Sequence, residues 1–223
     1  MKFLIVIPAR KGSSFTGKNM FPILGKPMIG YTMDAVKCID AEFKQQYPFD
    51  VLVTTDDHYV KAEAEIRGFL IHERAEKLAD AKATLDEVMV EIVKTYPGYD
   101  FYACLPPTSP LRNQKHIKEA MVQIVAEQAD SLISCYEEHK SIWAKTGRYA
   151  VPIVERSKNR QEVDPSYIAN GAIFISRGEN IKKNRVKVSG RVSVYEMGAY
   201  ESIVDVHGRE DILMAEKMMR GRE

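Results

Sequence analysis

Cysteine and tryptophan are scarce in this sequence, with three and one among 223 residues. The three cysteines, Cys38, Cys104 and Cys135, are too few and too widely spaced for a disulfide framework, so we expect buried thiols in the cytoplasm. No apolar run reaches the roughly 18 residues that a membrane-spanning helix needs, so we expect no membrane partner. The apolar N-terminal run ends at Pro8 and continues into Arg10-Lys11-Gly12, which does not fit a signal peptide.

A large excess of one charge is also lacking. Lys and Arg total 32 and Asp and Glu total 31, which gives a net charge of +1. Bulk nucleic-acid binding depends on neutralising phosphates, so we expect no nucleic-acid partner. A hydrophobic fraction of 45% and a charged fraction of 28% are typical of a globular chain that needs neither disulfide nor metal to fold.

Short apolar segments alternate with amphipathic helical segments along most of the chain. We predict buried strands at 3–7, 51–55, 69–71, 100–105, 131–135, 172–175 and 192–197. We predict helices at 28–39, 60–67, 85–95, 115–128 and 211–219. This alternation predicts a single α/β domain over residues 1–223, with a mostly parallel central sheet flanked by helices. Residues 136–168 are polar and mixed, which predicts a projecting arm or lid within that domain.

Four polar segments are expected at the carboxyl ends of the strands, at 9–19, 56–57, 106–112 and 205–207. Ligands of open α/β sheets bind at the carboxyl ends of the strands, so these segments are expected to converge on one crevice. The first segment combines glycines with cationic side chains, a composition that suits phosphate binding. It matches neither a P-loop nor a dinucleotide fingerprint, so a solvated charged turn is the alternative interpretation.

Several motifs carry a more specific resemblance. They are Ile-Pro-Ala-Arg-Lys-Gly-Ser at 7–13 with Gly-Lys-Asn at 17–19, Gly-Lys-Pro-Met-Ile at 25–29, Pro-Thr-Ser-Pro-Leu-Arg at 107–112, and Asn-Gly-Ala-Ile-Phe at 170–174. In this order, and over nearly the whole chain, they resemble the acylneuraminate cytidylyltransferases, also called CMP-sialic acid synthetases.

The resemblance implies a nucleotidyltransferase fold of Rossmann type and an enzyme that joins CTP to an acidic sugar, giving a CMP-sugar and pyrophosphate. The expected sugar is a sialic-acid-like nonulosonate that is activated for glycan assembly. The resemblance also implies Mg²⁺ and a homodimer built with the arm.

The same resemblance implies roles for individual residues. The nucleotide-binding residues would be Ala9, Arg10, Gly12, Ser13, Lys18, Asn19 and Arg74. The sugar-binding residues would be Thr108, Ser109, Arg160, Asn170 and Phe174, with Arg160 offering a guanidinium fork to the sugar carboxylate. The catalytic residues would be Arg10, Lys18 and Asp205, and the metal ligands would be Asp205 and His207.

Three departures from the family pattern leave alternatives open. The loop at 12–15 is one residue short and lacks a lysine, Pro106 replaces a glutamine, and His207 replaces a second carboxylate. Imidazole suits Mn²⁺ or Zn²⁺ better than Mg²⁺. Three roles for His207 therefore stay open: a poorer metal ligand, a group that contacts a metal ligand, or a base for the sugar hydroxyl. The alternatives are the same fold acting on another acid sugar or a phosphonate, the use of GTP, and a non-catalytic nucleotide- or sugar-binding protein.

Overall fold

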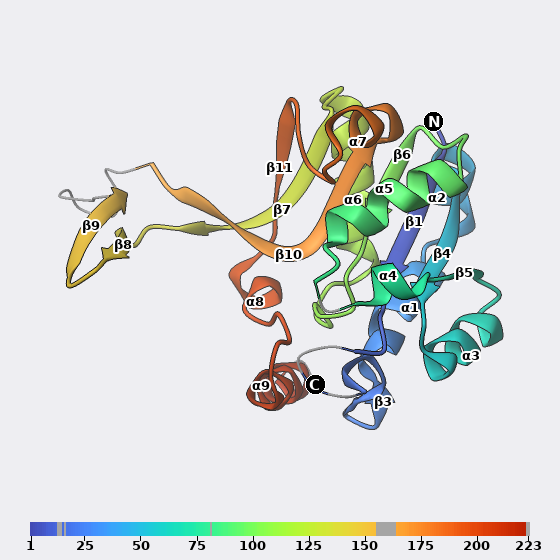
Figure 1. Cartoon of the computed structure of the whole chain (residues 1–223), viewed down its shortest axis with the longest axis horizontal. Coiled ribbons are helices and arrows are strands. Elements are labelled where there is room, and N and C mark those ends of the chain that lie inside the picture. The colour runs from blue at the N-terminus through green and yellow to red at the C-terminus, as the bar shows by residue number, and fades with distance from the viewer. Residues whose placement is uncertain (13–14, 16, 81, 155–163, 222–223) are drawn as a thin grey trace.

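A seven-stranded sheet lies between two layers of helices in the computed structural model, which describes residues 1–12, 15, 17–80, 82–154 and 164–221 (Figure 1). Its strand order is β11-β7-β10-β6-β1-β4-β5. The strands are β1 Phe3–Pro8, β4 Phe49–Thr55, β5 Leu70–Glu73, β6 Phe101–Cys104, β7 Ser131–Glu138, β10 Ser166–Arg177 and β11 Val192–Glu196.

Most neighbouring strands of this sheet run in the same direction. The pairs β1–β4, β1–β6, β4–β5 and β7–β11 are parallel, and β10 is antiparallel to both β6 and β7. The continuous apolar run of β1 follows from burial on both faces, because alternate side chains point to opposite sides of a strand. The predicted α/β fold with a mostly parallel sheet is confirmed.

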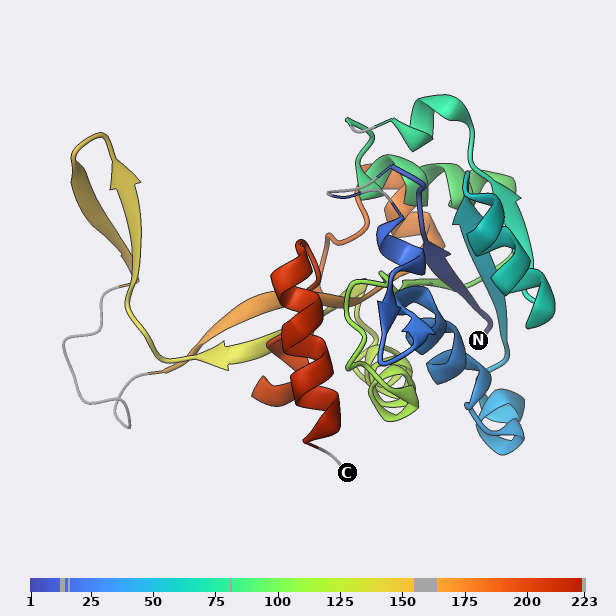
Figure 2. The same ribbon diagram turned by 90° about the horizontal axis from the view of Figure 1, so that it is seen from below.

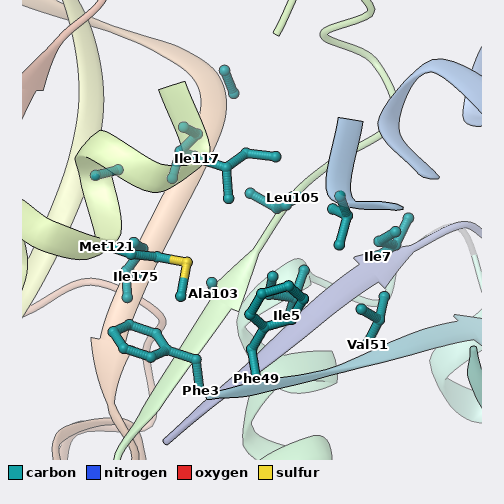
Figure 3. Packing of buried hydrophobic residues seen from close by; sticks show 14 of the residues in the cluster. Phe3, Ile5, Ile7, Phe49, Val51, Ala103, Leu105, Ile117, Met121 and Ile175 are labelled. Atoms are coloured by element: carbon teal, nitrogen blue, oxygen red, sulfur yellow. The ribbon is translucent and has the colours of Figure 1, made fainter. Parts of the chain in front are cut away.

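Helices cover both faces of the sheet. One face packs against α1 Met28–Lys37, α3 His58–Ile66 and α6 Gln114–Ala126, and its core holds the β1 side chains Ile5 and Ile7 (Figure 3). The other face packs against α4 Glu76–Ala79, α5 Leu85–Thr95 and α7 Gly178–Asn184. The long amphipathic helices were predicted from their apolar spacing. The short helices α2 Ala41–Gln46, α4, α7 and α8 Ala199–Ser202 were not predicted.

A smaller apolar cluster closes the carboxyl edge of the sheet. It joins the last helix, α9 Arg209–Arg220, to a short ribbon made of β2 Pro22–Ile23 and β3 Lys26–Pro27. Val206 is fully buried in this cluster, so the chain on either side of it is held in place. The 3-10 helix η1 Lys18–Met20 lies at the same edge.

A two-stranded arm leaves the body of the protein (Figures 1 and 2). The end of β7 and the start of β10 remain paired beyond the sheet, with Ser166 opposite Glu138. A hairpin of β8 Ile142–Thr146 and β9 Tyr149–Val154 forms its tip. No helix in the part of the chain that the structure describes is long and apolar enough to cross a membrane.

Candidate active site

A cleft of about 250 Å³ opens where β1 and β6 end. Three cationic side chains line it, and the described residues of its wall include no carboxylate. This charge distribution suits an anionic ligand such as a polyphosphate. The lining residues are Pro8, Arg10, Lys18, Asn19, Arg74, Ala83, Thr84, Leu85, Val88, Pro106, Pro107 and Thr108.

Lys18 is the most enclosed cation of the N-terminal loop. Its side chain is buried, and its Nζ donates a 3.0 Å hydrogen bond to the carbonyl oxygen of Val206. Burial lowers the pKa of Lys18, which the Asp205 carboxylate partly opposes and Arg10 reinforces. An ammonium group in such a site interacts with a phosphate much more strongly than it would in water.

Two arginines reach the cleft from the ends of strands, Arg10 after β1 and Arg74 after β5. Arg10 Nη1 donates to the carbonyl oxygen of Asp80 at 2.7 Å, which holds the side chain across the cleft mouth. Arg74 is buried directly after β5, and its Nη2 donates to the carbonyl oxygen of Thr54 at 3.1 Å. Burial lowers the pKa of Arg74, and the Asp56 carboxylate partly opposes this shift.

The remaining loop residues predicted to bind nucleotide are placed differently from one another. Asn19 lines the cleft and donates from Nδ2 to the carbonyl oxygen of Arg10 at 2.9 Å. The Ala9 side chain points into the core, so only its backbone could meet a ligand. Gly12 is exposed with open space around it. Ser13 lies outside the described residues.

Asp205 stands next to Lys18 with one oxygen unsatisfied. Its Oδ2 is 3.0 Å from His207 Nε2, whereas Oδ1 is buried and makes no hydrogen bond within the described structure. Gly171 makes room for this carboxylate, because a Cβ there would lie 3.1 Å from Asp205 Oδ2. Gly171 also has φ of +72°, a conformation that favours glycine. A side chain at position 171 would therefore crowd the Asp205 carboxylate.

Asp205 and His207 are the side chains at this edge that suit a divalent cation. The buried, unpartnered Oδ1 of Asp205 is a hard acceptor of the kind that Mg²⁺ prefers. The described residues contain no group of three His, Cys, Asp or Glu side chains placed to hold a metal. Next to Asp205 Oδ1, the ring of His207 is the nearest other group of a ligating type, with Nε2 3.0 Å from Asp205 Oδ2.

The Pro-Thr-Ser-Pro-Leu-Arg segment forms a rigid wall after β6. Thr108 lines the cleft, and its carbonyl oxygen accepts the Val206 N–H at 2.8 Å. Arg112 is buried behind this wall and donates to the carbonyl oxygens of Pro106 and Ala172 at 3.0 and 2.6 Å. Ser109 is buried, and its hydroxyl has no hydrogen-bond partner in the described structure. The segment therefore links the cleft to the β10 strand.

The predicted sugar-binding residues are not all at the cleft wall. Asn170 is buried and already engaged, accepting from Ser134 Oγ at 2.6 Å and donating to Ser202 Oγ at 2.9 Å. These contacts hold the irregular turn of β10 that contains Gly171. Phe174 packs against the apolar cluster under α5. Arg160 lies outside the described residues.

The first turn of α5 was missed as part of the site. Thr84 caps this helix in a reciprocal pair with Glu87, and Thr84 and Leu85 line the cleft. A Thr-x-x-Glu spacing before an apolar helix is a capping-box signature, so the sequence did carry the signal for where this helix begins. It carried no signal that this end of the helix faces the cleft.

Comparison with known proteins identifies the family. A family model described as cytidylyltransferase matches residues 4–202. An N-acylneuraminate cytidylyltransferase of Streptococcus agalactiae serotype V is 33% identical over 220 residues, which cover 96% of this chain and 52% of that protein. One from Escherichia coli O18:K1:H7 is 30% identical over 221 residues, covering 96% and 51%. The chain thus spans about half the length of these relatives.

A solved structure shares the fold at much lower identity. It is CMP:2-keto-3-deoxy-manno-octonic acid synthetase in complex with CTP, with a TM-score of 0.74, 18% identity and full coverage of both chains. The predicted nucleotidyltransferase fold is therefore confirmed, and with a family match over most of its length the chain belongs to the cytidylyltransferase family.

Proposed function

We propose that this chain transfers the cytidylyl group of CTP to a hydroxyl of an acidic, sialic-acid-like nonulosonate. The sugar oxygen forms a bond to the α-phosphorus, the bond to the β-phosphate oxygen breaks, and pyrophosphate leaves. One observation carries the proposal: a cleft lined by three cations lies beside a carboxylate with an unsatisfied buried oxygen. The names of the relatives support the choice of CTP and of the sugar.

Charge neutralisation is the main task in this reaction, because negative charge builds on the leaving group. Arg10 and Lys18 are assigned to the triphosphate, and Asn19 and Arg74 to the nucleotide. The structure supports a phosphate contact most strongly for Lys18, which is buried between the cleft and Asp205. Its bond to Val206 fixes the ammonium in advance, so little reorganisation is needed when charge develops.

We propose that Asp205 and His207 hold one divalent cation, Mg²⁺ or Mn²⁺. Such an ion supplies Lewis-acid stabilisation of phosphate charge when it is bound. Asp205 offers Oδ1 for this purpose, and the nearby His207 ring offers a softer nitrogen. Gly171 leaves room for the Asp205 carboxylate on the β10 side, because a Cβ there would lie 3.1 Å from Asp205 Oδ2.

The sugar is assigned to the β10 side of the cleft. Thr108 lines the cleft, Ser109 is buried in the same segment, and Phe174 packs against the apolar cluster under α5. Asn170 holds the turn of β10 through its hydrogen bonds. Arg160 is assigned to the sugar carboxylate.

We also propose a homodimer that works in the cytoplasm. The arm hairpin exposes Tyr149, Val151 and Ile153, whose alternate spacing puts them on one face of β9. Such an apolar row on a projecting hairpin suits contact with a second copy. All three cysteines are free thiols, as suits a reducing compartment; Cys104 and Cys135 are buried as expected, whereas Cys38 is exposed.

Pyrophosphate release tests the function directly. Purified protein is assayed with CTP and GTP, each crossed with sialic-acid-type and eight-carbon keto-acid sugars, in the presence of Mg²⁺ or Mn²⁺. We expect release with CTP and an acidic nonulosonate, and loss of that release in Asp205→Asn. Glu210→Gln is the matched control, because Glu210 is an exposed carboxylate in the same segment.

The other outcomes separate the alternatives. Release only with GTP or only with an eight-carbon sugar would keep the fold and change the substrate. Binding of CTP without release under either metal would favour a nucleotide-binding protein, which the contact of His207 with Asp205 motivates.

A further inference from the structure

A buried arginine joins two of the segments that form the candidate site. Arg112 is 2% exposed and lies behind the wall that follows β6. Its Nη1 donates to the carbonyl oxygens of Pro106 and Ala172 at 3.0 and 2.6 Å, and its Nη2 donates to Thr32 Oγ1 at 2.5 Å. One planar guanidinium therefore ties the wall, the turn of β10 and helix α1 together.

The charge of Arg112 is held by neutral groups. Its three hydrogen-bond acceptors in the described structure are two carbonyl oxygens and a hydroxyl, and its Nε has no partner there. Burial lowers the pKa of Arg112 to about 9, so the side chain is still charged at neutral pH. An apolar side chain would fill this space without the cost of burying a charge. Stability alone thus gives no reason for an arginine here.

A first connection leads from Arg112 to Asp205 through β10. Arg112 holds the carbonyl oxygen of Ala172, the residue after Gly171. The backbone of Gly171 faces the Asp205 carboxylate so closely that a Cβ there would lie 3.1 Å from Oδ2. A shift of this turn would change the space that the carboxylate occupies. Arg112 therefore limits the position of Asp205 from the β10 side.

A second connection leads through the wall. Pro106 lines the cleft, and Arg112 holds its carbonyl oxygen. Two residues further on, the carbonyl oxygen of Thr108 accepts the N–H of Val206 at 2.8 Å. Val206 directly follows Asp205 in the chain. Both connections from Arg112 thus end at Asp205, although Arg112 is not among the residues that line the cleft.

We propose that Arg112 is a positioning residue that fixes the Asp205 carboxylate for binding a divalent cation. The inference rests on the proposed function and adds a residue to its metal site. Arg112 acts through two main-chain segments and touches neither the metal nor the substrates. Replacing a residue that orients a metal ligand typically weakens metal binding by about 10- to 100-fold.

Metal affinity tests this inference without relying on turnover. Electron paramagnetic resonance gives the Kd for Mn²⁺ of the complex with CTP, for the unaltered protein and for Arg112→Lys and Arg112→Gln. Lysine keeps the charge and glutamine keeps an N–H donor, but neither reproduces the planar fork. We expect each replacement to raise this Kd by about tenfold. Glutamine leaves no buried charge, so Arg112→Gln carries the test if Arg112→Lys does not fold.

Thr32→Val is the matched control, because it removes only the bond from Arg112 to α1. It leaves one buried donor without a partner, so it should lower the free energy of unfolding and leave the Kd for Mn²⁺ unchanged. An unchanged Kd in the folded Arg112 variants would overturn the inference. An equal rise in Thr32→Val would also overturn it, because the loss would then come from a loosened fold.

The proposed function can fail separately from this inference. If the unaltered protein binds Mn²⁺ and CTP but releases no pyrophosphate with any sugar, the transferase function is contradicted. A tenfold weaker Mn²⁺ affinity in the Arg112 variants would still support the inference in that case. Absence of Mn²⁺ binding by the unaltered protein with CTP would overturn the inference together with the proposed metal site.

Discussion

The Lys18 ammonium donates to the carbonyl oxygen of Val206, 188 positions further along the chain. Val206 stands between Asp205 and His207, and its own N–H donates to the Thr108 carbonyl oxygen at 2.8 Å. One buried residue thus joins the cationic loop, the rigid wall after β6 and the acidic segment. The positions of Lys18 and Asp205 are consequently coupled, and a change at either is expected to affect the other.

Replacement of Lys18 by methionine tests the proposed role of the buried cation. Lys18→Met keeps most of the side-chain volume and removes the charge, so we expect kcat/KM for CTP to fall by about 100-fold. Initial-rate kinetics of pyrophosphate release measure this change. Lys115→Met is the control, since Lys115 is 75% exposed on α6 and its loss should leave kcat/KM unchanged. Equal activity of Lys18→Met and the unaltered protein would remove Lys18 from the mechanism.

Replacement of His207 by aspartate tests the metal ligands without relying on activity. A second carboxylate suits Mg²⁺ better than imidazole, so His207→Asp should lower the Kd for Mg²⁺ by about tenfold. Competition of Mg²⁺ against Mn²⁺, followed by electron paramagnetic resonance with CTP present, gives the Kd. His58→Asp makes the same substitution at an exposed position of α3. An unaltered Kd in His207→Asp would place His207 outside the coordination sphere.

The sheet and its long helices could be predicted from the sequence because their signals are local. A continuous apolar run marked β1, and an apolar stripe marked α5, whose predicted bounds match the observed Leu85–Thr95. Only part of β10 was predicted, as 172–175, because Gly171 interrupts the alternation and the residues before it belong to the exposed arm. The short helix α7 has too few turns for a recognisable apolar stripe.

The residues of the candidate site that follow strand ends could be predicted from the sequence. Contacts between residues far apart in the sequence could not. Arg10, Lys18 and Thr108 could be assigned to one crevice because parallel strands end at the same edge. The contact of Lys18 with Val206 joins positions 188 residues apart, and no local pattern marks it. The internal bonds of Asn170 are likewise visible only in the folded chain.

A pH-dependent loss of stability is expected from His116 at the start of α6. Neutral His116 accepts the Asn113 N–H on Nδ1 at 3.2 Å, and burial lowers the pKa of His116 below its ordinary value of 6.5. The unfolded chain therefore takes up a proton at higher pH than the folded protein does. The free energy of unfolding should fall as pH decreases below about 6.5, until the folded imidazole is also protonated.

Urea unfolding at about pH 7.5 and about pH 5 measures this dependence. His116→Gln keeps a hydrogen-bond acceptor and cannot titrate, so it should lose less stability over this interval than the unaltered protein. His58→Gln changes an exposed histidine and should follow the unaltered protein. The same pH dependence in His116→Gln would assign the effect to other groups.

The arm hairpin is expected to support a dimer through one of its two faces. Ile153 is 66% exposed and shares a face of β9 with Tyr149 and Val151, whereas Ala150 points to the opposite face. A lysine placed in the apolar part of an interface loses hydration without gaining a partner, so Ile153→Lys should shift the protein toward monomer. Ala150→Lys adds the same charge on the other face and should remain dimeric. Light scattering during size-exclusion chromatography over a range of concentrations distinguishes the two results, and equal dissociation of both variants would show that this face of the hairpin does not form the contact.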